Sequence, residues 1–242
     1  MEWRDEALIL SARPFGENSK IVEVLTPNEG RAAGMVRGAR SKAMRALLQP
    51  GNLVHANWRG RLSDQLGTLS LELLHARAGL VMASPWGAFG LQSLAALLAL
   101  LPERDPHPRL YAASVALIEA FAMAEAAGEA GVRFELILLE EFGFGLDLRA
   151  CAVTGEVDQL THVSPKSGRA VSAAAATPYA DRLLRLPAFL ADDSPVDGPS
   201  LVDGFHLTGY FLDKHVATLA GKRLPDARER FIRATVKGLQ SS

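Results

Sequence analysis

The sequence has a single cysteine and few aromatic residues. Only Cys151 carries a thiol among the 242 residues, which excludes an internal disulfide framework and any structural zinc site built on two or more thiolates. This composition is typical of a reducing, cytoplasmic setting. Because aromatic residues make up only 7% of the chain, we expect any polymer-binding surface to rely on charge more than on stacking.

Long hydrophobic runs are also missing. The most apolar stretch, residues 88–101, falls short of the roughly 18 to 20 residues that a membrane-spanning helix needs, so we interpret it as a buried helix. The first residues include Arg4, Asp5 and Glu6, which is unlike a secretory signal. We therefore expect no membrane partner.

Motifs for catalysis are absent or incomplete. The chain has no GxxxxGK loop, no HExxH and no GxSxG. The pair Gly143 and Gly145 lacks the third glycine of a dinucleotide fingerprint. Glu140 and Glu141 would point about 100° apart on a helix, which is poor geometry for acid–base work on one atom. The six histidines are scattered. We expect a protein that is not an enzyme and binds no cofactor or metal.

Acidic residues are missing from one long segment. Residues 30–61 contain no Asp or Glu, although the formal net charge of the chain is −1. Such segregation predicts a positive patch that suits a polyanion; the alternative is a solvated loop with an incidental charge excess. The segment contains seven cations: Arg31, Arg37, Arg40, Lys42, Arg45, Arg59 and Arg61.

Period-2 patterning dominates the first part of the chain. Apolar or alternating runs at residues 7–12, 21–25, 53–59 and 68–73, with turn signals between them, indicate strands. With a third strand ahead of a longer connection at 41–48, five strands predict a small closed barrel such as an OB-fold, within residues 1–80. Trp58 alternates in phase with Val54 and Ala56, so we predict that it lies in the core. Phe15, in the first turn, is either a stacking platform or a core residue.

Helical periodicity follows and predicts a helical domain over residues 81–242, so the fold class is α+β. We expect helices at residues 88–101, 109–127, 132–142, 178–191 and 201–219, with breaks at Gly128 and Gly131. Ser200 and Asp203 resemble a capping box for the last of them, and Gly221 is a plausible stop. Residues 146–178 predict a compact insertion with short strands near 160–164 and 169–172.

Several short motifs occur in a specific order along the chain. They are Arg13-Pro-Phe-Gly-Glu17, Leu25-Thr-Pro27, Glu29-Gly-Arg31, Gly38-Ala-Arg40, Leu48-Gln-Pro50, Leu66-Gly67-Thr68, Arg133-Phe-Glu-Leu136, and Gly143-Phe144 ahead of Leu148 and Cys151. Each motif alone is weak, but in order and spacing they resemble those of the RecO family of DNA recombination and repair proteins. The resemblance covers the chain from about residue 8 to residue 219.

The resemblance implies an N-terminal OB-fold and a helical domain that holds a small zinc-finger-like insertion. It also implies binding of single- and double-stranded DNA, annealing of complementary strands, and work with the single-strand-binding protein and RecR to load recombinase, in the cytoplasm at the nucleoid. The chain departs from zinc-binding members because Cys151 begins Cys-Ala-Val-Thr instead of a CxxC pair. We expect the insertion to lack the metal ligands.

The cations and the resemblance together predict the binding residues. On the barrel, the expected DNA-binding residues are Arg13, Lys20, Arg37, Arg40, Lys42 and Arg45; Arg31, Arg59 and Arg61 are weaker candidates. In the helical domain the resemblance implies that Arg133 receives the acidic, Phe-ended tail of the single-strand-binding protein; the alternative is a pair with a local carboxylate. A different function also stays open, in which the barrel is an adaptor whose basic face binds an acidic protein segment.

Overall fold

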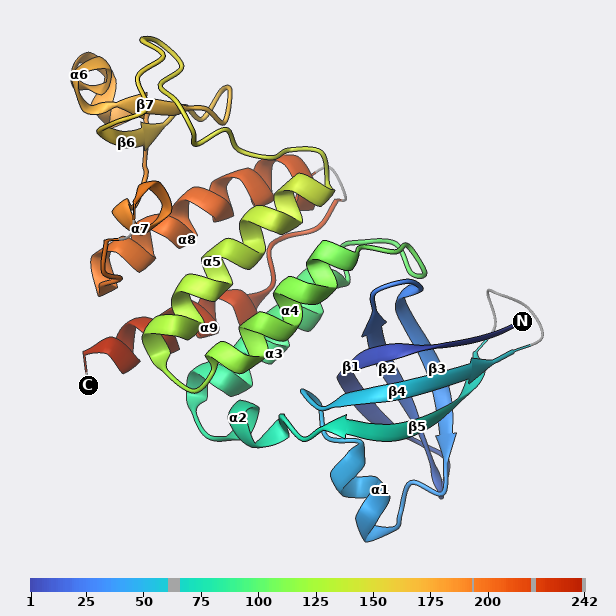
Figure 1. Cartoon of the computed structure of the whole chain (residues 1–242). Coiled ribbons are helices and arrows are strands. Elements are labelled where there is room, and N and C mark those ends of the chain that lie inside the picture. The colour runs from blue at the N-terminus through green and yellow to red at the C-terminus, as the bar shows by residue number, and fades with distance from the viewer. Residues whose placement is uncertain (61–65, 193, 219–220, 241–242) are drawn as a thin grey trace. The chain divides into compact units, whose positions relative to one another are not determined.

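The computed structural model describes residues 1–60, 66–192, 194–218 and 221–240. The chain divides into two compact units, Met1–Ala122 and Met123–Ser242, whose elements are labelled in Figure 1. The helices between residue 81 and residue 122 therefore belong to the same compact unit as the barrel. The domain boundary at residue 80 stays a prediction. Within the described residues, no helix is long and apolar enough to cross a membrane.

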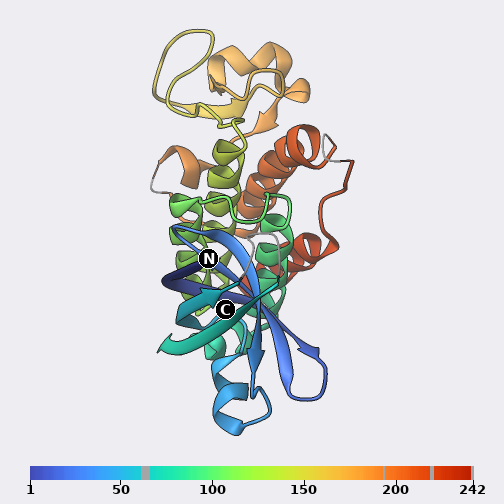
Figure 2. The same ribbon diagram turned by 90° about the vertical axis from the view of Figure 1, so that its right-hand side faces the viewer.

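A closed barrel of five strands forms the first part of unit 1, as the alternating pattern predicts. Around the barrel the order is β1-β2-β3-β5-β4 (Figures 1 and 2). The β3–β5 pair is parallel, whereas the other pairs are antiparallel. The architecture is that of an OB-type barrel. The strands are β1 (Glu2–Phe15), β2 (Ser19–Thr26), β3 (Gly30–Arg37), β4 (Leu53–Arg59) and β5 (Gly67–His75).

Alternate residues of each strand fill the barrel interior. Trp58 is fully buried among Val22, Val36 and Leu69, which confirms the prediction that it belongs to the core. The predicted buried face of β5 ends early, because Leu73 is 50% exposed. Its partner in β4 is Val54, next to a shift in the strand register. The irregular pairing leaves this end of the strand outside the packed interior.

In the described part of unit 1, four helices accompany the barrel. Helix α1 (Lys42–Leu47) occupies the connection between β3 and β4, and α2 (Ala78–Met82), α3 (Pro85–Leu98) and α4 (Pro108–Ala120) follow β5. Ser84 caps α3 by accepting a hydrogen bond from the N–H of Gly87. The single helix predicted for residues 109–127 is wrong: α4 ends at Ala120 and α5 begins at Ala124.

Three long helices organise unit 2, namely α5 (Ala124–Glu141), α8 (Gly198–Leu212) and α9 (Asp226–Leu239). Helix α5 packs against both α8 and α9. The predicted breaks at Gly128 and Gly131 are wrong, because both glycines lie inside α5. A Cβ on Gly128 would lie 2.4 Å from Leu201 Cδ1, and one on Gly131 would lie 2.6 Å from Phe231 Cε1. These glycines allow close helix packing and do not end the helix.

The insertion is a small sheet of order β7-β6-β8. Its strands are β6 (Leu160–Val163), β7 (Ala170–Ser172) and β8 (Leu184–Arg185). The first two confirm the expected short strands. The helix predicted for residues 178–191 is wrong: a 3₁₀ turn at Thr177–Arg182, β8 and a short α7 (Ala188–Ala191) replace it, and α6 (Ala173–Ala176) precedes them. The pairing of β8 with β6 outweighs the local helical pattern.

The start of α8 differs from the predicted cap. Asp197 is the N-cap, and its carboxylate accepts a hydrogen bond from the N–H of Ser200 at 2.7 Å. The Ser200 hydroxyl accepts one in return from the N–H of Asp197 at 3.0 Å. Ser200 is therefore the inner member of the capping box, and Asp203 has no part in it. After a π turn at Asp213–Ala217, Gly221 adopts a φ of +65°, while the predicted end at Leu219 lies outside the described residues.

Candidate nucleic-acid interface

Strand register gathers cations from three strands at one end of the barrel. Phe15 of β1 pairs with Ser19 of β2, which pairs with Arg37 of β3. Arg13 lies two residues before Phe15, so the two side chains share the outer face of β1. Lys20 follows Ser19, so its partly exposed side chain lies on the opposite face of β2, the face of the inward-pointing Val22. The sequence pattern could not bring these residues to one end of the barrel, because register is a property of the folded sheet.

The connection after β3 brings three more cations to the same end. Gly38 takes a φ of +68°, and the N–H of the next residue, Ala39, donates to the carbonyl of Asn18 at 3.1 Å. The end of β3 is thereby fixed to the β1–β2 turn. Ser41 then caps α1 by accepting from the N–H of Met44 at 3.2 Å. The exposed cations of this segment are Arg40, Lys42 and Arg45.

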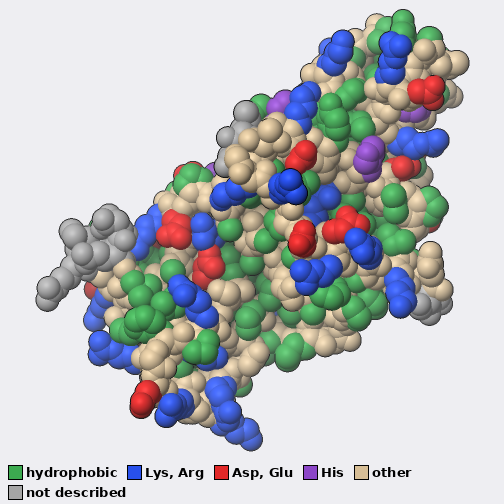
Figure 3. All heavy atoms as spheres, turned by 180° about the vertical axis from the view of Figure 1, so that it is seen from behind, with side chains coloured by type: hydrophobic (Ala, Val, Ile, Leu, Met, Phe, Trp, Pro, Cys, Tyr) green, Lys and Arg blue, Asp and Glu red, His purple; other side chains and the backbone are tan. Residues whose placement is uncertain are grey.

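These six cations form what we call the basic barrel end: Arg13, Lys20, Arg37, Arg40, Lys42 and Arg45. Within the described part of the chain, none of the six forms an ion pair. Lys and Arg side chains gather over this end of the barrel at the lower left of Figure 3. The only acidic residue in the segments 13–20 and 37–45 is Glu17. Positive charge in this arrangement attracts a polyanion and releases its counterions on binding.

The weaker DNA-binding candidates have different surroundings from the six cations of the basic barrel end. Arg31 is largely buried, with 14% of its side chain exposed, and pairs with Glu23 and Glu103. Arg59 pairs with Glu2 at 2.7 Å, and Arg61 lies outside the described residues. Neutralisation by a neighbouring carboxylate lowers the attraction that Arg31 or Arg59 offers to a phosphate. The structure thus separates these residues from the basic barrel end.

The two candidate aromatic platforms have opposite environments. Trp58 stacks on Trp3 with ring centroids 6.2 Å apart, donates its ring N–H to the carbonyl of Ala33 at 3.0 Å, and lies under the guanidinium of Arg104. It is fully buried and has no face for a ligand. Phe15, by contrast, is 48% exposed.

Arg133 of unit 2 has local partners. Its Nε donates to Glu129 at 2.8 Å, and its Nη2 donates to the carbonyl of Phe189 at 2.9 Å. This is the local carboxylate pair that sequence reasoning leaves open as an alternative. The side chain is 51% exposed, and the apolar neighbours Phe134 and Leu138 are buried.

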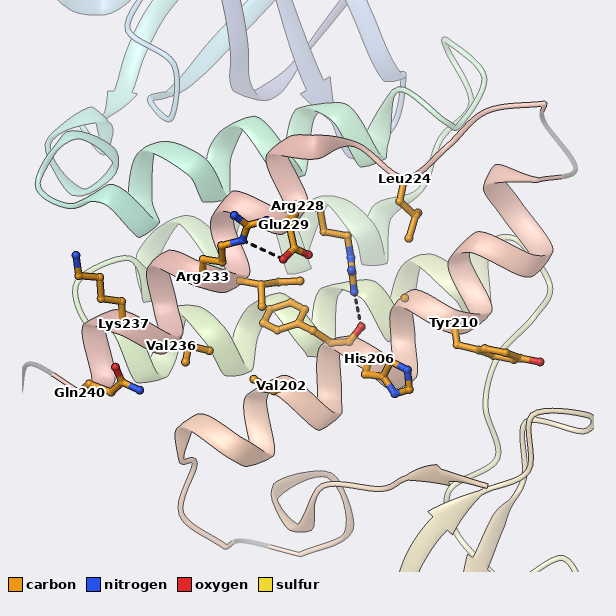
Figure 4. A pocket seen from close by; sticks show the side chains of 13 residues that line it. Val202, His206, Tyr210, Leu224, Arg228, Glu229, Arg233, Val236, Lys237 and Gln240 are labelled. Atoms are coloured by element: carbon orange, nitrogen blue, oxygen red, sulfur yellow. Dashed lines mark hydrogen bonds and ion pairs between the residues drawn. The ribbon is translucent and has the colours of Figure 1, made fainter. Parts of the chain in front are cut away.

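A groove between α8 and α9 is the feature of unit 2 that sequence reasoning misses. Its volume is about 730 Å³, and Figure 4 shows the side chains that surround it. The sequence analysis predicts no helix at the position of α9 (Asp226–Leu239). The many charged residues of this segment obscure the apolar residues that recur at helical spacing. The apolar lining includes Val202, Phe205, Leu224, Ile232 and Val236, and the polar lining includes His206, Tyr210, Arg228, Glu229, Arg233 and Lys237.

The insertion does not fit a zinc ion. Among the described residues, no three His, Cys, Asp or Glu side chains lie close enough together to hold a metal. Cys151 is buried, and its Sγ accepts a hydrogen bond from the N–H of Ser172 at 3.3 Å. Burial raises the pKa of Cys151, but hydrogen bonds from Ser172 and Thr154 outweigh it and lower the pKa to about 6. Backbone pairing and packing hold the fold of this segment, including the bridge between Asp147 and Arg169.

An OB-type barrel with a basic end, joined to a helical region with a small β insertion, defines a class of barrel-and-helix proteins with a surface suited to polyanions. The comparisons with known proteins identify the family within that class. The model "Recombination protein O N terminal" matches residues 1–77, and "Recombination protein O C terminal" matches residues 88–224. The chain belongs to the RecO family of DNA repair proteins.

Curated relatives agree over their full length. A DNA repair protein RecO of Bradyrhizobium sp. (strain ORS 278) is 50% identical, with 98% of this chain and 97% of the relative covered. One from Sinorhizobium medicae is 46% identical, with 100% and 98% covered. One from Methylobacterium nodulans is 50% identical, with 96% and 97% covered.

Proposed function

We propose that the protein is a non-enzymatic mediator of DNA repair that binds single- and double-stranded DNA through the basic barrel end. The observation that carries the proposal is the convergence of six cations, without ion-pair partners among the described residues, on one end of the barrel. Such a surface holds phosphates while the base edges remain free to pair. It also lowers the repulsion between two strands, which is what annealing needs.

In this proposal the protein anneals complementary strands and works at the nucleoid with the single-strand-binding protein and RecR to load recombinase at gaps. Family membership supports this finer role. The competing function, an adaptor whose basic face binds an acidic protein segment, uses the same cations but predicts weak binding to DNA.

A charge-reversal experiment separates the two functions. We expect the variant Arg37→Glu, Arg40→Glu, Arg45→Glu to bind an unstructured oligonucleotide about tenfold or more weakly than wild type, because three phosphate contacts become repulsive. It should also lose strand annealing. A matched control, Lys166→Glu, Arg182→Glu, Arg185→Glu, makes the same change in net charge on exposed residues of unit 2. Equal affinity for wild type and the barrel variant would reject the DNA surface.

For the partner tail, we propose docking on unit 2 at one of two places. One is Arg133, whose Nε and Nη2 already have protein partners. The other is the α8–α9 groove, where apolar lining can bury an aromatic ring. Its cation Arg233 is held in an exposed ion pair with Glu229 at 3.1 Å, and a tail carboxylate would compete with Glu229 for it. The groove is favoured because it is open and its apolar lining is accessible.

One titration discriminates these places. The probe is a synthetic peptide with acidic residues and a C-terminal Phe. Docking in the groove predicts that Ile232→Glu abolishes binding, whereas Arg133→Glu leaves it unchanged; docking at Arg133 predicts the reverse. If both variants bind like wild type, unit 2 does not receive the tail at either place.

A further inference from the structure

One aromatic side chain stands apart from the core of unit 1. Phe15 is 48% exposed at the end of β1, and it is the only aromatic residue of this unit, among those described, that is exposed. Apolar rings are ordinarily buried because their transfer out of water is favourable. Single exposed apolar side chains are common, so it is the position of this ring inside a charged surface that makes it a candidate contact for a ligand.

The neighbours of Phe15 across the strands leave the ring about half exposed and place positive charge near it, while Glu17 in the adjoining turn is the one carboxylate of residues 13–20. Its cross-strand partner is Ser19, a small residue, and the next residue along that row is Arg37. Strands lie about 4.8 Å apart, so the Cα atoms of Phe15 and Arg37 are separated by roughly 10 Å. Arg13 lies about 7 Å away on the same face of β1. Cations thus flank the ring on two sides.

The ring is carried by a fixed hairpin. Gly16, directly after Phe15, takes a φ of +65° and closes the β1–β2 turn. The N–H of Ala39 donates to Asn18 in that turn, which couples Phe15 to the segment that carries Arg40 and Lys42. Because the backbone that carries the ring is held in this way, ligand binding costs little ordering of the loop.

We infer that Phe15 is the base-stacking platform of the basic barrel end, and that this surface therefore selects an unpaired strand with its bases exposed. The inference rests on the proposed DNA-binding function. An unpaired base stacks on the ring while its phosphates reach Arg13 and Arg37. A base in a duplex is already covered on both faces. A protein partner would need a wider apolar patch, and the side chains beside Phe15 are Arg13, Ser19 and Arg37.

The test compares two single-stranded probes of equal length and charge, one with thymine bases and one abasic. Wild type should bind the thymine strand about five- to tenfold more tightly, the lower part of the range for one stacked base. Phe15→Leu should lose most of this ratio while its affinity for the abasic strand stays unchanged, and Phe15→Tyr should keep it. Leu73→Ala, at a residue of similar exposure, is the matched control.

Two further binding measurements, one at high salt and one with duplex DNA, test the same inference. The loss in Phe15→Leu should persist at high salt, since stacking is not screened, and the affinity for duplex DNA should not change. If Phe15→Leu retains the full preference for the thymine strand, Phe15 is not the platform. That result leaves the proposed function standing as long as the Arg37, Arg40 and Arg45 charge reversal weakens binding; if neither variant changes DNA binding, the proposed function fails as well.

Discussion

At the scale of single residues, one buried ion pair joins the three long helices of unit 2. Arg228 of α9 donates to both carboxylate oxygens of Glu135 of α5, at 2.7 and 2.9 Å, and to the carbonyl of Phe205 of α8 at 2.6 Å. Thr208 of α8 also donates to Glu135. Burial alone would lower the pKa of Arg228, but the Glu135 carboxylate outweighs it and raises that pKa. Arg228 also lines the α8–α9 groove, so this pair holds one of the groove's lining residues in place.

Removing the charge of Glu135 tests how much its buried ion pair with Arg228 stabilises unit 2. We expect Glu135→Gln to lower the free energy of unfolding by about 3 to 5 kcal/mol, because it leaves the buried guanidinium of Arg228 without a counter-charge. The matched control is Glu129→Gln, which breaks the more exposed pair with Arg133 and should cost less than about 1 kcal/mol. Urea unfolding followed by circular dichroism measures both. Equal losses in the free energy of unfolding for the two variants would show that the buried pair contributes no more to stability than the exposed one.

At the scale of elements, glycine in α5 sets how closely the helices of unit 2 pack. A Cβ on Gly131 would meet the rings of Phe231 and Phe205 at 2.6 and 3.0 Å, so α8 and α9 can approach α5 only because this residue has no side chain. Such a glycine contrasts with Gly79 of α2, where nothing lies within 4 Å of the added Cβ.

Alanine substitution at these two glycines should therefore have opposite effects. Gly131→Ala should lower the free energy of unfolding by about 1 to 3 kcal/mol through overpacking. Gly79→Ala should raise it by about 0.5 to 1 kcal/mol, since alanine favours a helix where there is room. Thermal unfolding of the two variants beside wild type decides the matter. A stabilising effect at Gly131 would contradict the packing described for α5.

How far the elements were predictable depends on whether their signal is local. Period-2 alternation in residues 53–59 indicated β4 and the burial of Trp58 correctly, because one face of a barrel strand must be apolar. The sequence predicts breaks at the interior glycines of α5, whereas these glycines serve packing against α8 and α9, which lie far along the chain. The helix predicted for residues 178–191 is absent for a related reason, since the pairing of β8 with β6 overrides the local helix propensity.

The candidate site was predictable to the same extent. Charge segregation in residues 30–61 indicated a basic surface, but it could not distinguish the exposed Arg37 from Arg31, whose partner Glu23 lies across the β2–β3 ladder. The α8–α9 groove was beyond reach because one of its walls, α9, was not expected. Long-range pairing decides which charges remain available, and sequence spacing does not contain it.

At the scale of the whole molecule, two compact units offer two kinds of surface. Unit 1 carries the basic barrel end with Phe15, and unit 2 carries an apolar groove with cations among its lining residues. The near-zero net charge of the chain gives no sign of these two surfaces, because positive and negative residues elsewhere cancel in the sum. The proposed function, in which the chain holds a nucleic acid and docks a protein, uses both kinds of surface.

The salt dependence of single-strand binding tests the central claim most directly. Each neutralised phosphate of a single strand contributes about −0.7 to the slope of log K against log salt concentration, so six contacts predict a slope of about −4. The neutral variant Arg37→Gln, Arg40→Gln, Arg45→Gln should make this slope shallower by about 2. The same slope for wild type and variant would contradict the claim that the basic barrel end binds the DNA backbone.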